Sequence, residues 1–220
     1  MIEPKLRSEV YDDDLIAVCE KIRGSYLTSS YDHRALLPPL EHFSMKDVLL
    51  DEEFRVTYAC FKRAVAMAIQ PKTIIEFGVG MGITAMAFMD ACPNSSYIGY
   101  DNDQDHKSLQ VKPTMYVAGL MKLKNYKCVM HSVNTQDGLA IQPADLIHID
   151  ACHLYGCTYN DTVLALRGNC EWILVDDCRY SSIAAAVLAA VKDIFPGSTH
   201  WTYFEHTWTG NILIHRKKGG

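Results

Sequence analysis

Four side chains that could carry chemistry together follow two short apolar runs in the second half of the chain. Asp150 follows the first run and has His153 three residues behind it, and the pair Asp176 and Asp177 follows the second run. Three carboxylates brought close together repel one another, and a bound divalent cation removes that repulsion. Mg²⁺ prefers oxygen ligands, commonly carboxylates with water and substrate oxygens. We therefore predict a Mg²⁺ site formed by Asp150, Asp176 and Asp177.

A second chemical pattern lies earlier, where an apolar run over residues 73–77 is followed by Gly78, Gly80 and Gly82. Glycines let the backbone turn sharply and let a ligand lie against bare main chain, and the start of the next helix offers free N–H groups. A dinucleotide fingerprint would need glycine where Ile83 stands, and a phosphate loop would need a lysine that is absent here. The pattern favours a nucleotide-like cofactor and disfavours an NAD-dependent oxidoreductase.

The sequence Glu76-x-Gly78-x-Gly80-x-Gly82 resembles the cofactor loop of class I S-adenosylmethionine (SAM) methyltransferases. The resemblance implies SAM as the cofactor. It places Asp101 at the ribose hydroxyls. The alternative is that the Asp-Asn-Asp stretch beginning there is only turn or helix-cap chemistry, which suits Asp103, whereas for Asp101 we favour the ligand role. The full set of cofactor-binding residues that the resemblance implies is Glu76, Gly78, Gly80, Gly82, Thr84, Asp101, Asn102, Ser132, Asn134 and Asp150.

A narrower resemblance concerns the metal-dependent O-methyltransferases of the catechol and antibiotic-tailoring types. These enzymes place one Asp after the fourth strand, an Asp-Asp or Asp-Asn pair after the fifth, and a Lys or His base three residues after the first Asp. Asp150, His153, Asp176 and Asp177 match that spacing. The resemblance implies Asp150 and His153 as catalytic residues, with His153 as the base. Catechol-type enzymes usually carry Lys at this point, so the histidine favours the antibiotic-tailoring branch.

Alternating strand and helix patterns must position these residues. We expect an α/β fold, a Rossmann-like doubly wound sheet of seven strands, mostly parallel with a C-terminal antiparallel hairpin, and an N-terminal helical arm. In such sheets ligands bind beyond the carboxyl ends of the strands. The expected strands are 73–77, 96–100, 127–132, 145–150, 172–177, 199–205 and 210–215. The expected helices are 52–69, 83–91, 104–110, 115–123, 158–167 and 182–195.

The chain divides by pattern into a polar and aromatic N-terminal segment, 1–51, and a regular domain, 52–220. The N-terminal segment has little periodicity apart from a helix near 12–23. It is either a surface arm packed on the domain or a lid over an active site, since long irregular segments in compact domains are often functional. Arms of this type frequently pack against a second subunit in related enzymes, so a homo-oligomer stays open.

The bulk composition restricts the partners. The 220 residues are 49% hydrophobic and 21% charged with a net charge of −5, which is typical of a globular domain. The sequence has no basic block, which disfavours nucleic acid. It has no apolar run of about 18 residues and no apolar N-terminal core, so we expect no membrane partner and a cytoplasmic location. The eight cysteines form no Cys-x-x-Cys pair, so we expect reduced thiols.

Together these patterns predict a SAM-dependent methyltransferase that moves a methyl group to a hydroxyl of a small-molecule acceptor, with natural-product tailoring as the setting. Mg²⁺ would assist, and His153 would act as base. Two alternatives stay open: a metal-independent small-molecule N-methyltransferase, and a SAM-binding partner subunit without catalysis.

Overall fold

A computed structural model of the chain describes residues 12–37, 46–101, 126–130, 141–195 and 199–216. The predicted helices 104–110 and 115–123 lie outside these ranges. In the described part of the chain, no helix is both long and apolar enough to cross a membrane.

The strands form one mixed sheet in the order β3-β2-β1-β4-β5-β7-β6. Its first five strands run parallel, and β7 pairs antiparallel with both β5 and β6. The predicted Rossmann-like α/β fold is confirmed. The strand order reverses between β1 and β4, and such a switch point opens a crevice at the carboxyl ends of the strands. The strand bounds are β1 Thr73–Phe77, β2 Ser96–Asp101, β3 Tyr126–Met130, β4 Leu146–Ile149, β5 Trp172–Val175, β6 Thr199–Phe204 and β7 Asn211–Arg216.

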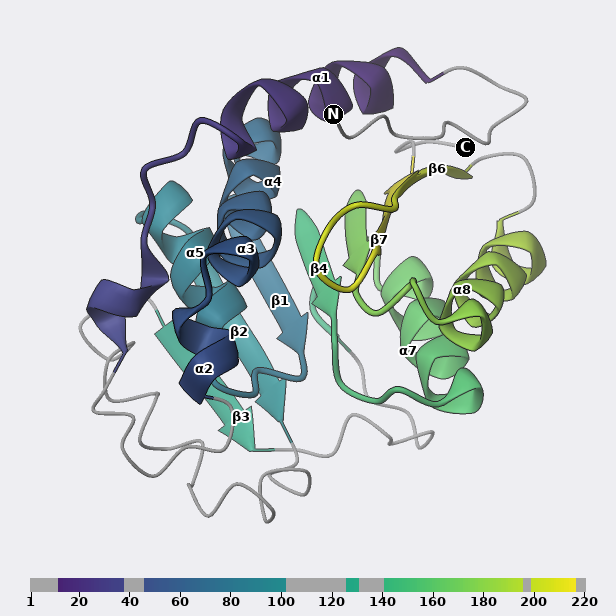
Figure 1. Ribbon diagram of the computed structural model, residues 1–220. Helices are drawn as coiled ribbons and strands as arrows, with labels where there is room; N and C mark the ends of the chain where they lie inside the picture. Colours follow the sequence, from purple (N-terminus) through teal and green to yellow (C-terminus); the bar gives the residue numbers. More distant parts are fainter. Residues whose placement is uncertain (1–11, 38–45, 102–125, 131–140, 196–198, 217–220) are drawn as a thin grey trace.

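Helices cover both faces of the sheet, as Figure 1 shows. One face packs against α1 (Asp13–Tyr26), α4 (Phe61–Ile69) and α5 (Ile83–Ala91). The other packs against α7 (Tyr155–Arg167) and α8 (Ser181–Ile194). Because side chains alternate along a strand, Ile74 of β1 enters the first layer while Ile75 enters the second. Both faces are therefore buried, which explains the apolar character of the central strands.

The helical stretch predicted for 52–69 is present, with a turn of different pitch in its middle. It consists of α3 (Glu52–Phe54), the π-helical segment η2 (Arg55–Cys60) and α4. Asp51 caps its start by accepting a hydrogen bond from the Phe54 N–H at 3.0 Å. Gln70 ends it in the left-handed conformation. π-Helical turns are rare and occur frequently at functional sites.

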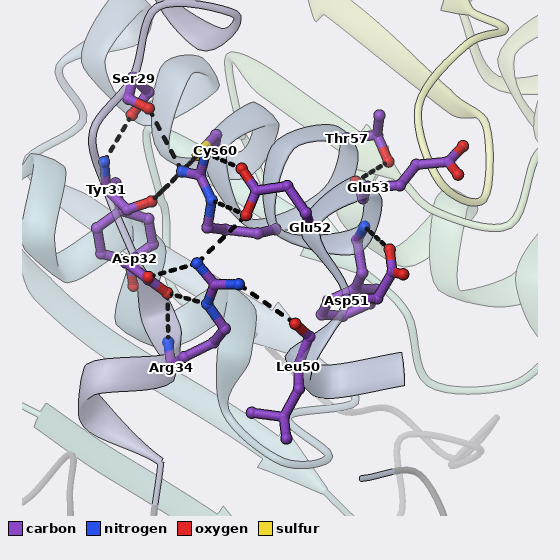
Figure 2. A network of polar contacts seen from close by, with 12 residues as sticks. Ser29, Tyr31, Asp32, Arg34, Leu50, Asp51, Glu52, Glu53, Thr57 and Cys60 are labelled. Atoms are coloured by element: carbon purple, nitrogen blue, oxygen red, sulfur yellow. Dashed lines mark hydrogen bonds and ion pairs between the residues drawn. The ribbon is translucent and has the colours of Figure 1, made fainter. Parts of the chain in front are cut away.

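The N-terminal segment is bonded to the start of this helical stretch, as Figure 2 shows. The segment also contains η1 (His33–Leu36) and α2 (Lys46–Leu50). The Arg34 guanidinium lies 2.6 Å from Asp32 and 3.2 Å from Glu52, and Arg55 donates to the Tyr31 carbonyl at 2.6 Å. Buried residues of α1 lie in the same apolar cluster as those of α4. A division of the chain at residue 51 stays a prediction.

Candidate active site

The glycine loop connects β1 to α5 at the carboxyl edge of the sheet. Gly78, Gly80 and Gly82 all have positive φ, at 83°, 50° and 74°. Gly82 lies directly before the first residue of α5, so the loop ends at a helix N-terminus. Free N–H groups at such a helix start suit a polar or anionic ligand.

Gly78 is required by space as well as by conformation. A Cβ at this position would lie 2.1 Å from the carbonyl oxygen of Asp150, far inside contact distance. The loop therefore passes directly against the segment that leaves β4. This close approach brings the predicted cofactor loop next to the first predicted acidic residue.

Asp101 lies at the end of β2, beside the glycine loop. Its Oδ2 accepts hydrogen bonds from the N–H groups of Val79 and Gly80, both at 2.9 Å. The carboxylate thus fixes the conformation of the loop from the β2 side. Its predicted contact with the ribose stays a prediction.

Glu76 lies in the sheet interior, on the face covered by α4 and α5. Its carboxylate accepts hydrogen bonds from the Tyr97 hydroxyl and from Nδ1 of His148, the latter at 2.9 Å. Only 1% of Glu76 is exposed, and burial is the main reason why its pKa lies well above the usual range. The structure therefore gives Glu76 a role in the interior, while a direct contact with the cofactor stays a prediction. Asn102, Ser132 and Asn134 lie outside the described residues.

The exits of β4 and β5 bring together Asp150, His153 and Asp177. The His153 Nε2 lies 2.9 Å from Asp177 Oδ2 and 3.6 Å from Asp150 Oδ1, so the imidazole bridges the two carboxylates. The histidine side chain is 63% exposed, whereas those of Asp150 and Asp177 are 21% and 10% exposed. Asp177 has φ of 57°, which turns the chain sharply after β5. The spacing of these three residues in the sequence becomes a compact cluster in space.

Asp176 belongs to a different set of contacts. Its Oδ2 lies 2.9 Å from the Nζ of Lys62, and its Oδ1 accepts from the Asp177 N–H and from the Thr209 hydroxyl. The side chains of Lys62 and Asp176 are 0% and 1% exposed. The three predicted metal ligands therefore lie on neighbouring strand exits, but two of them bond to His153 and the third bonds to a buried lysine.

The electrostatics of the cluster follow from burial and from these pairings. Burial, and then the neighbouring Asp176 charge, raise the pKa of Asp150 to about 6, against the opposing hydrogen bond from His153. The hydrogen bonds to Asp150 and Asp177 raise the pKa of His153 to about 11. At neutral pH the imidazole is therefore protonated in this arrangement. His153 and Lys62 therefore place positive charge beside the three carboxylates. From the sequence we had expected a bound metal alone to supply that charge.

The residues present fit a divalent cation in part. Ligand atoms of Asp150, His153 and Asp177 all lie within 4.8 Å of one another, and the two carboxylates suit Mg²⁺ with water or substrate oxygens. A second group, His148, Asp150 and Asp176, meets the same distance. There, however, the Lys62 Nζ lies 2.9 Å from both His148 Nε2 and Asp176 Oδ2, so a cation already occupies the position.

Two residues of this region were not predicted from the sequence. Tyr58, in the π-helical segment, donates its hydroxyl to Asp150 Oδ2 at 3.1 Å and also meets the Thr84 hydroxyl at 3.1 Å. Lys62 follows one turn later. The signal for Lys62 was available, because it stands four residues after Tyr58 and three before Val65, inside an apolar helical stripe. A lysine in such a stripe indicates a buried charge with a specific partner.

Two cavities lie near these residues. One of about 10 Å³, the size of a single water, is lined by residues from Asp150 to His153 and from Val175 to Asp177, with Thr158 and Ile183. A larger one of about 100 Å³ is lined by Glu53, Thr57, Arg179, His206, Thr207 and Trp208. Two residues of its lining are close in sequence to residues of this region: Arg179 follows Asp177 by two positions, and Trp208 precedes Thr209, whose hydroxyl bonds to Asp176.

No family model matches the sequence, and a comparison with curated proteins finds no match. Solved structures of similar fold are found. The SAH-bound methyltransferase PaMTH1 of Podospora anserina is 14% identical with a TM-score of 0.56, and the match covers 96% of this chain and 91% of that one. TomG of Streptomyces achromogenes, an O-methyltransferase involved in tomaymycin synthesis and solved in complex with SAM, is 14% identical with a TM-score of 0.54. That match covers 94% of this chain and 100% of the TomG chain.

An O-methyltransferase from Bacillus cereus in complex with SAH is 12% identical with a TM-score of 0.51, and the match covers 96% of this chain and 94% of that one. At such low identities these likenesses establish the fold alone. In fold, this chain resembles the class I SAM-dependent O-methyltransferases.

Proposed function

We propose that this chain is a SAM-dependent methyltransferase that transfers a methyl group to a hydroxyl of a small molecule. The observation that carries the proposal is the adjacency of the glycine loop and the Asp150–His153–Asp177 cluster at one edge of the sheet. Gly78 lies directly against the Asp150 carbonyl. A cofactor held along the loop would therefore present its reactive group beside the cluster. The SAM and SAH bound in the fold relatives named above support the choice of cofactor.

The reaction would be an in-line displacement at the methyl carbon of the sulfonium. SAM held along the loop would supply the methyl group, whose bond to sulfur would break as its bond to the acceptor oxygen formed, leaving SAH and a methylated oxygen. Alignment of the two reactants is the protein's main contribution and is worth up to about 7–11 kcal/mol in favourable models. The glycine loop, Asp101 and Thr84 would hold the cofactor for this alignment.

The acceptor hydroxyl must also lose its proton, and we propose His153 as the base. In the arrangement described, Asp150 and Asp177 keep the imidazole protonated. His153 can accept a proton only when those two carboxylates are engaged elsewhere. A divalent cation on the carboxylates would supply that engagement and would lower the pKa of the acceptor hydroxyl. The exposure of the His153 side chain leaves it free to turn toward an acceptor.

The test is methyl transfer from labelled SAM to a panel of phenolic, sugar and amine acceptors, with and without EDTA. We expect transfer to a hydroxyl, loss of turnover with EDTA, and recovery on addition of Mg²⁺. Asp150→Ala and His153→Ala are expected to lower kcat at least a hundredfold, as is usual for groups that take part in proton transfer. Circular dichroism and thermal unfolding of each variant serve as the control for folding. Full activity under all of these conditions would exclude the metal and base roles.

One observation favours a second candidate, a metal-independent N-methyltransferase. Lys62 and protonated His153 already neutralise two of the three carboxylate charges. A neutral amine is nucleophilic without activation and requires mainly to be positioned. Turnover of an amine acceptor that EDTA does not change would favour this candidate over the first.

The acceptor is expected to reach the cluster from the larger cavity. Trp208 lies in its wall, and its ring packs edge-to-face on Phe54 with ring centroids 5.4 Å apart. Its backbone N–H donates to the Thr57 carbonyl at 3.2 Å. A held aromatic ring of this kind suits a flat or sugar-like ligand. We expect Trp208→Ala to raise the KM for the acceptor about tenfold, the size of one lost aromatic contact, with little change in SAM affinity.

A further inference from the structure

Lys62 is a fully buried ammonium whose three hydrogen bonds are all directed at named acceptors. Its Nζ lies 2.9 Å from His148 Nε2, 2.9 Å from Asp176 Oδ2 and 2.7 Å from Asn211 Oδ1. A lysine carries three N–H donors and no acceptor, so this set uses all of them. The three partners come from β4, from the exit of β5 and from β7. The lysine therefore links three neighbouring strands on the face that α4 covers.

The direction of each bond follows from chemistry. The His148 ring must accept at Nε2, so its proton lies on Nδ1, which donates to Glu76. Glu76 also receives the Tyr97 hydroxyl. A continuous path of hydrogen bonds thus runs from β2 and β1, beneath the glycine loop, through His148 and Lys62 to Asp176. None of these links requires a bound ligand.

Both oxygens of Asp176 already have hydrogen-bond partners. Lys62 holds one oxygen, and the Asp177 N–H and the Thr209 hydroxyl hold the other. Asp150 and Asp177 differ from Asp176, because their side chains are 21% and 10% exposed and the partner that they share, His153, is 63% exposed. A divalent cation can displace His153 toward solvent, whereas displacing Lys62 would strand an ammonium in the core at high cost.

We propose that Lys62 is the resident counter-cation of Asp176, and that Asp150 and Asp177 without Asp176 form the divalent-cation site. The metal half of this proposal rests on the function proposed above. The sequence predicted a metal ligand at all three positions, so this proposal departs from that prediction at Asp176. Because Lys62 is fully buried, it would act only through the groups to which it donates.

The test is a measurement of Mn²⁺ binding with Mn²⁺ as the only added ligand. Calorimetry measures the affinity, and electron paramagnetic resonance measures the concentration of the free ion. We expect Asp150→Asn and Asp177→Asn each to weaken binding at least tenfold. Asp176→Asn is expected to stay within threefold of wild type. Asp193→Asn, the same substitution at the far end of α8, is the matched control for loss of one negative charge. Weakening by Asp176→Asn equal to that by Asp150→Asn would overturn the proposal.

The role of Lys62 is tested by thermal unfolding without metal. Lys62→Met leaves the Asp176 carboxylate buried and unpaired, so we expect a clear fall in Tm. The double variant Lys62→Met/Asp176→Asn removes both charges and is expected to recover part of that fall. Equal Tm values for the single and double variants would overturn the counter-cation role. If the wild-type protein binds no Mn²⁺, the proposed metal site fails, and so does the role of the metal in the proposed function. The unfolding comparison of the Lys62 variants would still test Lys62 as the counter-cation of Asp176.

Discussion

At the scale of single residues, the site depends on positions where no other residue fits. Gly78 combines a positive φ of 83° with a space that a Cβ cannot enter, because the Asp150 carbonyl oxygen would lie 2.1 Å away. The same contact fixes where the cofactor loop lies relative to the acidic cluster. A change at this position therefore acts on both halves of the site.

We expect Gly78→Ala to destabilise the fold by about 2 kcal/mol or more, from the left-handed backbone and from the shift that the Asp150 carbonyl must make. SAM affinity should fall with it. Urea unfolding and calorimetry measure the two effects. Gly156→Ala in α7 is the matched control, because a Cβ there meets nothing within 4 Å and stability should stay level or rise slightly. Wild-type stability and SAM affinity in Gly78→Ala would contradict the prediction.

At the scale of elements, α7 carries a buried acid whose charge the fold does not compensate. Asp161 is 2% exposed, and its Oδ2 has no hydrogen-bond partner among the described residues. Burial raises the pKa of this carboxyl to about 7. The helix packs against both α8 and the sheet, where water cannot solvate the charged form. The folded protein therefore favours protonated Asp161.

The sign of the pH effect follows from that preference. Between the ordinary pKa near 3.8 and the folded pKa near 7, the folded state holds a proton that the unfolded state has lost. Stability should therefore fall as pH rises through this window, by at most about 4 kcal/mol from this group. Asp161→Asn mimics the protonated form, so it should be more stable than wild type at pH 8 and equal to it near pH 4. Urea unfolding at both pH values measures the difference in the free energy of unfolding between Asp161→Asn and wild type. An equal gain in stability at pH 4 and pH 8 would contradict a raised pKa of Asp161 as its cause.

The π-helical segment before α4 acts at the same scale. It places Tyr58 against Asp150 and Thr84 while Lys62, one turn on, reaches Asp176. We expect Tyr58→Phe to lower kcat/KM about tenfold, the size of one or two lost hydrogen bonds, with circular dichroism unchanged. Unchanged kinetics would show that the Tyr58 hydroxyl is not needed to orient Asp150.

At the scale of the whole molecule, the start of α1 is joined to the last strand. Asp12 caps α1 through Oδ1, which accepts from the Leu15 N–H at 3.0 Å, and its Oδ2 lies 3.0 Å from Nδ1 of His215 in β7. Both Asp12 and His215 are buried. This contact spans nearly the full described length of the chain, so α1 is part of the domain's packing on that face of the sheet.

We expect Asp12→Ala to lower the free energy of unfolding by about 1–3 kcal/mol, from the lost cap and the unpaired His215. For a chain of this size that corresponds to a fall in Tm of about 2–4 °C per kcal/mol. Asp13→Ala, an exposed neighbour in the same helical turn, is the control and should change Tm little. A similar fall in both variants would assign the effect to the helix terminus alone.

The sequence by itself determined the features that depend on local periodicity and local backbone geometry. The bounds predicted for β1 and for α5 agree with the structure, and the three glycines, where a sharp turn was expected, have positive φ. The acidic residues lie at the strand exits because parallel strands end at one edge. Such features follow from residue types within a few positions of each other.

Only the tertiary structure decided which charges meet. Lys62 and Asp176 are 114 residues apart in sequence, and Glu76 and His148 are 72 apart, yet both pairs are buried contacts. The sequence placed Asp150, Asp176 and Asp177 together but could not show that a lysine from α4 takes one of them and His153 bridges the other two. The physical reason is that the partner of a buried charge depends on which helix face packs on which strand, and periodicity alone does not specify that pairing.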